Sequence, residues 1–161
     1  MTLYGPFVQA ASDGRMGWLT DEFRPIPDQI RRTLDWLDAR TDYTYSIWRG
    51  ADPTAIDGYL KPANDSFIQA AGSADAMTVE VGFPGSDGEH HLYTVGRPEV
   101  VDGTTTLIPM SDDRAVRVFT NEIFTADEAA AIFHMFYLSE VVSAPYVLRE
   151  LDLAQELSEL R

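Results

Sequence analysis

The sequence predicts an α+β domain in which two main helices pack on one face of a mostly antiparallel sheet, a β-meander of about five to six strands. Three observations predict this fold. Apolar residues alternate with polar ones along short segments in the middle of the chain, which is typical of strands. Short turns join these segments and favour antiparallel pairing. Apolar residues in two other segments recur at helical spacing. A length of 161 residues and a hydrophobic content of 45% suit a single domain over residues 1–161.

The N-terminal third predicts one helix and one strand. We expect residues 1–25 to be irregular, because Gly-Pro and Asp-Gly turn signals interrupt them. Apolar residues at helical spacing predict a helix over 28–40, and Pro27 suits its start because the first N–H groups of a helix are unpaired anyway. Period-2 alternation predicts a strand over 43–48. The stretch 50–66 contains several Pro and Gly residues and predicts a loop.

The middle of the chain predicts a β-meander. Residues 77–83 and 91–95 both alternate, and the five residues between Phe83 and Glu89 form a turn, so this is the clearest hairpin in the chain. Three further segments predict strands: 67–71, 104–110 and 115–120. We expect the last two of these to continue the meander.

The C-terminal part predicts a helix, a last strand and a short helix. Thr125 and Glu128 have the spacing of a capping box, and apolar residues then recur at helical spacing over 126–140. The wide apolar face of this helix should pack across the sheet. We expect a final strand over 146–149 and a short acidic helix over 152–160.

Net charge is the observation that bears most on function. The chain has 26 acidic and 12 basic residues, for a net charge of −14, and the acidic residues are spread along its whole length. Such a surface repels phosphate backbones and anionic lipids, so we expect no nucleic-acid partner and no membrane partner. It attracts a basic protein and speeds their encounter. A simpler interpretation is that the charge keeps the protein soluble.

The sequence predicts no catalytic residue, no cofactor and no metal. The chain has no cysteine, no Gly-x-Ser-x-Gly motif and no Gly-rich phosphate loop. His90 and His91 are neighbours in a predicted strand, so their side chains should point to opposite faces. His134 has no His or carboxylate four residues away on its helix. The first residues lack a basic stretch followed by a long apolar run, so we expect no signal peptide and a cytoplasmic location.

Two features predict partner-binding residues. Trp36 lies off the apolar stripe of its helix, between Arg32 and Arg40, and Trp and Arg are enriched at interface hot spots. Alternatively, Trp36 packs under the N-terminal segment with an Arg stacked on its ring. Four acidic residues lie at successive strand connections: Asp87, Glu89, Asp112 and Asp113. They form a negative rim if these turns meet at one end of the sheet, and are ordinary solvated turn residues otherwise.

Five segments resemble a group of small actinobacterial proteins of unknown role: 67–73, 77–81, 92–98, 121–130 and 146–149. An acidic meander followed by a helix and a last strand is similar to immunity proteins of bacterial polymorphic toxin systems. The resemblance covers about residues 67–151 and carries no functional residue over. It implies a non-enzymatic protein that neutralises a cognate toxin, a basic domain, by covering its active site. Eleven of the twelve basic residues are Arg, which fits a GC-rich bacterial genome.

Other functions remain open at this stage. A secretion chaperone or adaptor would bind an extended segment of its client, often as a homodimer, and the sequence does not decide between monomer and homodimer. A small-ligand-binding protein or a hydrolase would need a pocket. Four aromatic residues are candidates to line one: Trp18, Trp48, Tyr43 and Tyr45.

Overall fold

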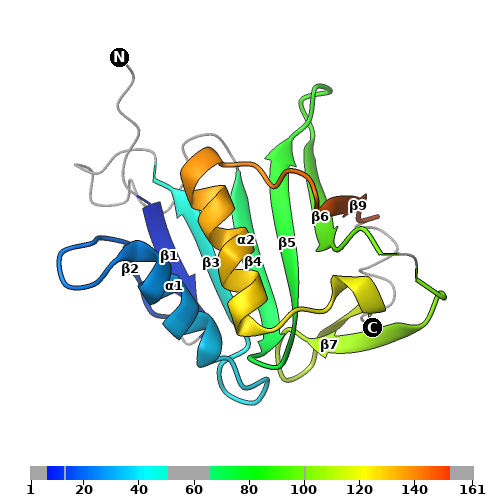
Figure 1. Cartoon of the computed structure of the whole chain (residues 1–161), viewed down its shortest axis with the longest axis horizontal. Helices are drawn as coiled ribbons and strands as arrows, with labels where there is room; N and C mark the ends of the chain where they lie inside the picture. The colour runs from blue at the N-terminus through cyan, green and yellow to red at the C-terminus, as the bar shows by residue number, and fades with distance from the viewer. Residues whose placement is uncertain (1–6, 13, 51–65, 100, 153–161) are drawn as a thin grey trace.

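A seven-stranded antiparallel sheet organises the chain (Figure 1). The computed structural model describes residues 7–12, 14–50, 66–99 and 101–152. The strands follow one another across the sheet in the order β2-β1-β3-β4-β5-β6-β9, and each neighbouring pair is antiparallel. Their bounds are β1 Phe7–Ala11, β2 Met16–Trp18, β3 Thr44–Arg49, β4 Phe67–Ser73, β5 Ala76–Pro84, β6 His90–Gly96 and β9 Val147–Glu150.

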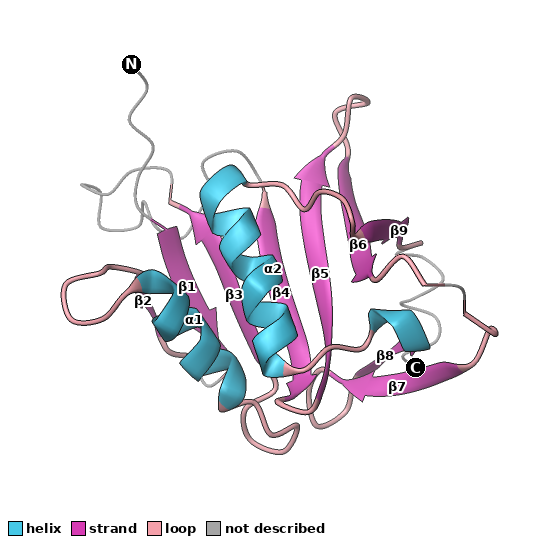
Figure 2. Cartoon of the chain, in the orientation of Figure 1, coloured by secondary structure: helices cyan, strands magenta, loops and turns pink. Residues whose placement is uncertain are grey.

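Two helices cover one face of this sheet, as the sequence predicts (Figure 2). They are α1 (Ile26–Asp35) and α2 (Ala126–Ser139), and they lie side by side. The capping box of α2 is present: the Glu128 N–H donates to the Thr125 hydroxyl at 3.4 Å, and the Thr125 N–H donates to the Glu128 carboxylate at 3.0 Å. The described part of the chain contains no helix long and apolar enough to span a membrane.

The main hydrophobic core lies between the helices and the sheet. Alternation along β5 places Val79 and Val81 on the helix side, where both are fully buried. From α2, Phe133 and Phe136 pack onto that face and are also fully buried. Each buried side chain of this size contributes about 1.5–3 kcal/mol relative to exposure, so this core holds α2 firmly across the middle of the sheet.

The N-terminal segment forms a hairpin, so the expectation of an irregular start was wrong. Val8 and Phe7 in β1 are buried, and β1 joins β2 to β3 by pairing with both. Gly14, with a φ of 89°, lies in the turn between the two strands. The turn signal was therefore correct, but the flanking strands are too short and too poorly alternating to be recognised from local pattern.

The predicted third and fourth strands of the meander form a separate sheet. β7 (Thr105–Pro109) and β8 (Ala115–Phe119) pair only with each other among the described residues. The free edge of β6 is instead taken by β9. Ile108, Val116 and Val118 form a second small core under this hairpin, and the short 3-10 helix η1 (Thr120–Glu122) follows it.

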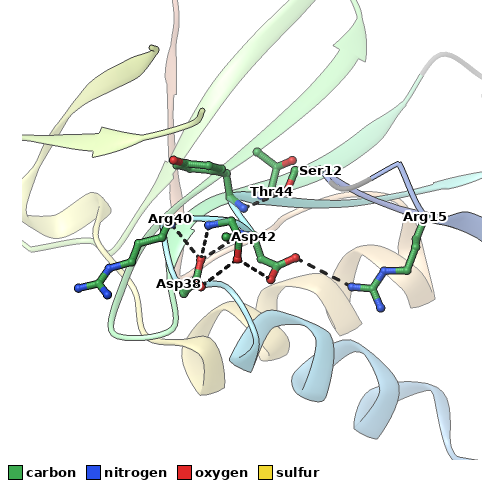
Figure 3. A network of polar contacts seen from close by, with 8 residues as sticks. Ser12, Arg15, Asp38, Arg40, Asp42 and Thr44 are labelled. Atoms are coloured by element: carbon green, nitrogen blue, oxygen red, sulfur yellow. Dashed lines mark hydrogen bonds and ion pairs between the residues drawn. The ribbon is translucent and has the colours of Figure 1, made fainter. Parts of the chain in front are cut away.

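Helix α1 ends at Asp35, five residues earlier than the predicted limit. Just beyond it, the Asp38 carboxylate accepts the backbone N–H groups of Arg40, Thr41 and Asp42 at 2.9, 2.9 and 3.0 Å (Figure 3). These bonds turn the chain into β3, because they satisfy N–H groups that a continuing helix would use. Most of the predicted loop 50–66 and nearly all of the predicted helix 152–160 lie outside the described residues.

Candidate functional site

The most distinctive surface of the described chain is a groove between α1 and the β1–β2 hairpin. It consists of two hollows of about 250 and about 260 Å³. The hollows share three lining residues: Gln9 from β1, and Thr33 and Trp36 from α1 and its C-terminal cap. Arg15 lines the first hollow, and Arg24 and Arg32 line the second. We call this surface the α1 groove.

Trp36 occupies the centre of the α1 groove. Its side chain is 57% exposed, although it follows directly on the well-packed helix α1. The Arg15 guanidinium carbon lies 5.6 Å from the centroid of the Trp36 ring, which is within the range of a cation–π contact. In the sequence, Trp36 lies between Arg32 and Arg40. The structure keeps Arg32 in the groove and adds Arg15 and Arg24 from the hairpin side.

Arg24 belongs to a loop that is tied to α1. The Gln29 side-chain amide, on the second turn of α1, donates to the carbonyl oxygens of Thr20 and Arg24, the latter at 2.6 Å. Leu19, at the start of the same loop, is buried and donates its N–H to the Phe7 carbonyl at 2.7 Å. These contacts hold the loop beside α1. They fix the backbone of Arg24, while its side chain is exposed.

The floor of the first hollow is formed by Tyr45 and Gln9. The Tyr45 hydroxyl donates to the Gln9 side-chain oxygen at 2.8 Å. Burial raises the pKa of Tyr45, because the phenolate form would lose its hydration, so the hydroxyl stays protonated and remains a donor. The bond fixes the Gln9 amide, whose nitrogen has no hydrogen-bond partner within the described part of the chain.

Polar contacts tie Arg15 to the turn that ends α1 (Figure 3). Arg15 Nη2 lies 4.0 Å from Asp42 Oδ1, and the Asp42 backbone is held by Asp38. The pKa of the exposed Asp38 carboxyl is lowered, first by the backbone N–H of Asp42 and then by those of Thr41 and Arg40. Asp38 therefore stays ionised and keeps its bond to the backbone of Asp42, the residue that lies against Arg15 at the edge of the groove.

The four predicted acidic residues do not form one rim. Asp87 and Glu89 lie in the β5–β6 turn, where Asp87 accepts the Glu89 N–H at 2.9 Å. Asp112 and Asp113 lie in the β7–β8 turn. Residues near that turn pack at the β4–β5 end of the sheet, whereas the β5–β6 hairpin projects from the opposite end (Figure 1). The two acidic pairs are thus separated by the length of β5, and neither lines the α1 groove.

The two neighbouring histidines point to opposite faces, as alternation predicts. The His90 ring stacks on Phe67, with 5.7 Å between centroids. His91 lies between two carboxylates: its Nε2 is 3.0 Å from Asp87 Oδ2, and its Nδ1 bonds Glu150. The pKa of His91 is raised, first by the bond to Glu150 and then by the bond to Asp87. Among the described residues, no group of three His, Asp or Glu side chains is arranged to hold a metal ion.

A polar row on the far face of the sheet was not anticipated from the sequence. Register places five residues opposite one another on successive strands: Ser46, Gln69, Glu80, Thr94 and Arg149. Glu80 and Thr94 are buried. Arg149 makes a bidentate bond to the buried Glu122 of η1, at 2.8 and 2.9 Å. This pair fastens β9 to the segment that follows the small sheet, which is a structural role.

Of the four aromatic residues predicted to line a pocket, Tyr45 alone lines either hollow among the described residues. Trp18 packs closely over Gly50: a Cβ atom added to Gly50 would lie 2.7 Å from the Trp18 ring. Sequence analysis missed Gln9, Arg15 and Arg24 because they lie in the segment expected to be irregular. A usable signal existed: Arg15 and Arg24 flank the first tryptophan of a strongly acidic chain.

No protein-family model, no curated protein and no solved structure matches this chain.

Proposed function

We propose that this protein is a non-enzymatic, protein-binding protein that docks a protein partner over the α1 groove. In its most specific form, which the sequence resemblance motivates, it is an immunity protein that covers the active site of a cognate bacterial toxin. The single observation that carries the docking site is Trp36, which is 57% exposed at the centre of a groove lined by three arginines.

The surroundings of Trp36 support a large partner. Met16 and Phe23, which flank the groove residues Arg15 and Arg24 in the chain, are 46% and 97% exposed. Exposed apolar side chains next to arginines have the composition of interface hot spots, which are enriched in Trp and Arg. Burying such side chains under a partner recovers hydrophobic free energy that the unbound protein lacks.

The chemistry of the groove supports binding rather than catalysis. The described residues that line it include no Asp, Glu or His that could act as a general base beside a substrate. Their polar side chains are guanidinium, amide and hydroxyl groups. The net charge of −14 supports a partner of net positive charge, because long-range attraction accelerates its encounter with this surface.

Affinity capture with matched variants tests the docking site. Immobilised wild-type protein, the Trp36→Ala variant and the Leu107→Ala variant are each incubated with extract of the source organism. Leu107 is 54% exposed on β7 and is a matched apolar control outside the groove. We expect Trp36→Ala to retain the partner at least tenfold less well, since hot-spot truncation costs about 2 kcal/mol or more. Equal retention by Trp36→Ala and the wild type would place the interface elsewhere.

Co-expression tests the immunity role separately. We expect the captured partner to arrest growth when it is produced alone, and the wild-type protein to restore growth where Trp36→Ala does not. A captured partner that depends on Trp36 but is harmless would leave the binding function in place and contradict the toxin-neutralising one. A client bound as an extended segment by a dimer of this chain would instead support the chaperone or adaptor alternative.

A small-ligand-binding function is the second candidate. It is favoured by one observation, the hydrogen-bonded Tyr45–Gln9 floor beneath the hollow of about 250 Å³. That volume is below the roughly 300–1,000 Å³ of typical ligand pockets, and Phe23, which lines neither hollow, would have no role in it. Protein binding uses all of these features.

A further inference from the structure

We propose that the α1 groove recognises an extended, carboxylate-bearing segment of the protein partner, with an apolar residue of that segment packed on Trp36. This inference rests on the proposed function and names the chemistry of the docking segment. The observation behind it is the positive charge of the residues that line the groove, which is opposite to the negative net charge of the whole chain.

The charged residues that line the two hollows are all cations, and Asp42 lies 4.0 Å from Arg15 at the edge of the groove. Arg15, Arg24 and Arg32 line its two hollows, whereas the chain as a whole has a net charge of −14. Within the described part of the chain, neither Arg24 nor Arg32 makes an ion pair. An arginine guanidinium presents a planar set of donors that matches a carboxylate, and such bidentate pairs are among the stronger hydrogen bonds in proteins.

The uncharged polar groups of the groove also favour an acceptor. The Gln9 oxygen is occupied by the Tyr45 hydroxyl, which leaves the two amide N–H groups of Gln9 to donate. The Gln29 amide is used by the loop carbonyls of Thr20 and Arg24 and is not offered to a ligand. A ligand rich in acceptor oxygens therefore satisfies the three guanidinium groups and the Gln9 amide, whereas the Thr33 hydroxyl, which donates to the Gln29 carbonyl, is left to accept.

The shape of the groove favours a segment over a single small anion. The two hollows meet at Gln9, Thr33 and Trp36, and their arginines lie on different walls, Arg15 in one hollow and Arg24 and Arg32 in the other. One carboxylate cannot occupy both hollows. Two or more carboxylates on either side of an apolar side chain can, because successive residues of an extended chain are about 3.3 Å apart.

This arrangement gives a binding orientation. The acidic remainder of the protein attracts a basic partner from a distance, and the α1 groove accepts only the acidic segment that the partner presents. The acidic segment is repelled by the acidic remainder of the protein, so the contrast in the sign of the charge selects one orientation.

A peptide titration followed by NMR tests the inference. The wild-type protein, labelled with ¹⁵N, is titrated with a capped Glu-Glu-Phe-Glu-Glu peptide, a capped Gln-Gln-Phe-Gln-Gln peptide and inorganic phosphate. The Trp36 indole signal is assigned with Trp36→Phe. We expect the acidic peptide to shift the Trp36 indole and the Gln9 side-chain amide saturably, at least fivefold more tightly than the other two probes. Equal binding of the neutral peptide would overturn the inference, and equal binding of phosphate would reveal a site for small anions only.

A pair of charge-matched variants isolates the groove arginines. Arg24→Gln with Arg32→Gln and Arg114→Gln with Arg117→Gln change the net charge equally, and all four side chains are exposed. We expect the first pair to weaken binding of the acidic peptide at least tenfold and the second less than twofold. Equal weakening by both pairs would mean that only net charge matters and would overturn the inference.

The outcomes separate this inference from the proposed function. Loss of partner capture in Trp36→Ala, together with no preference for the acidic peptide, overturns the carboxylate chemistry and keeps the docking site. A preference for the acidic peptide, together with full partner capture by Trp36→Ala, overturns the docking site instead.

Discussion

In the α1 groove three arginines line an open surface around an exposed tryptophan, whereas at the β5–β6 turn the charges meet each other. There His91 lies between Asp87 and Glu150, which brings the turn and the edge strand β9 together. The net charge of the chain therefore does not show which charged side chains are paired within the protein and which are exposed. At the hairpin the Asp87 carboxylate is engaged by His91, whereas Arg24 and Arg32 of the groove are exposed and make no ion pair with another described residue.

The comparison also separates two kinds of aromatic residue. Phe133 on α2 stacks on Tyr45, with 5.6 Å between ring centroids, and is fully buried beneath the groove. Trp36 lies on the solvent side of the same region. One ring supports the groove floor, and the other is exposed to solvent.

The largest expected effect therefore concerns Phe133. We expect Phe133→Ala to lower the free energy of unfolding by about 3–5 kcal/mol, because it leaves a cavity in the main core. Trp36→Ala should lower it by about 1 kcal/mol or less, since it removes an exposed ring and one cation–π contact. Urea denaturation of both variants measures the difference. A loss in Trp36→Ala that equals the loss in Phe133→Ala would make Trp36 a structural residue.

A smaller effect is expected from pH at the hairpin. The folded pKa of His91 is raised above its ordinary value of 6.5, by Glu150 first and Asp87 second. Its contribution to stability is therefore fully present below about pH 6.5 and is lost as the pH rises through the raised folded pKa. We expect the thermal midpoint of the wild type to exceed that of His91→Gln most at pH 5.5 and least at alkaline pH.

A parallel scan of His90→Gln is the control for this pH effect. His90 stacks on Phe67 on the opposite face of the strand, away from the two carboxylates that hold His91. A pH dependence that persists unchanged in His91→Gln would show that the carboxylates on either side of His91 do not stabilise its charged form.

The smallest expected effect is on fluorescence quenching at the groove. Iodide is an anion and should quench Trp36 more efficiently than caesium does, because Arg15, Arg24 and Arg32 concentrate anions near the ring. The Trp36 contribution is the difference between the wild type and Trp36→Phe. A preference for caesium would mean that the net charge of −14 dominates even at the groove, and the contrast between the two regions would disappear.

The elements that the sequence predicts well are those whose signals are local. Thr125 and Glu128 cap α2 as their spacing predicts, and the β5–β6 hairpin has the expected alternation and turn. A helix cap and a two-stranded turn are formed by residues a few positions apart, so their energetics can be judged from neighbouring letters. The fold class follows from the same local patterns.

The site was predicted only in part, for the same reason. The sequence singles out Trp36 as a candidate, but the residues beside it in the groove come from 21 positions earlier in the chain, at Arg15, and from β1, at Gln9. No local pattern indicates that these segments meet. The four acidic residues were assigned to one rim because the small sheet was expected to continue the meander.

The sequence by itself determined the α+β class, the two helices on one face, the hairpin in the middle and the acidic net charge. Only the tertiary structure decided that β9 takes the edge of β6, that β7 and β8 form their own sheet, and that three arginines line the groove that contains Trp36. The physical reason is the range of the interactions. Periodicity and capping act over one or two turns of chain, whereas strand pairing and the packing of a helix beside a hairpin depend on which distant segments bury the most apolar surface together.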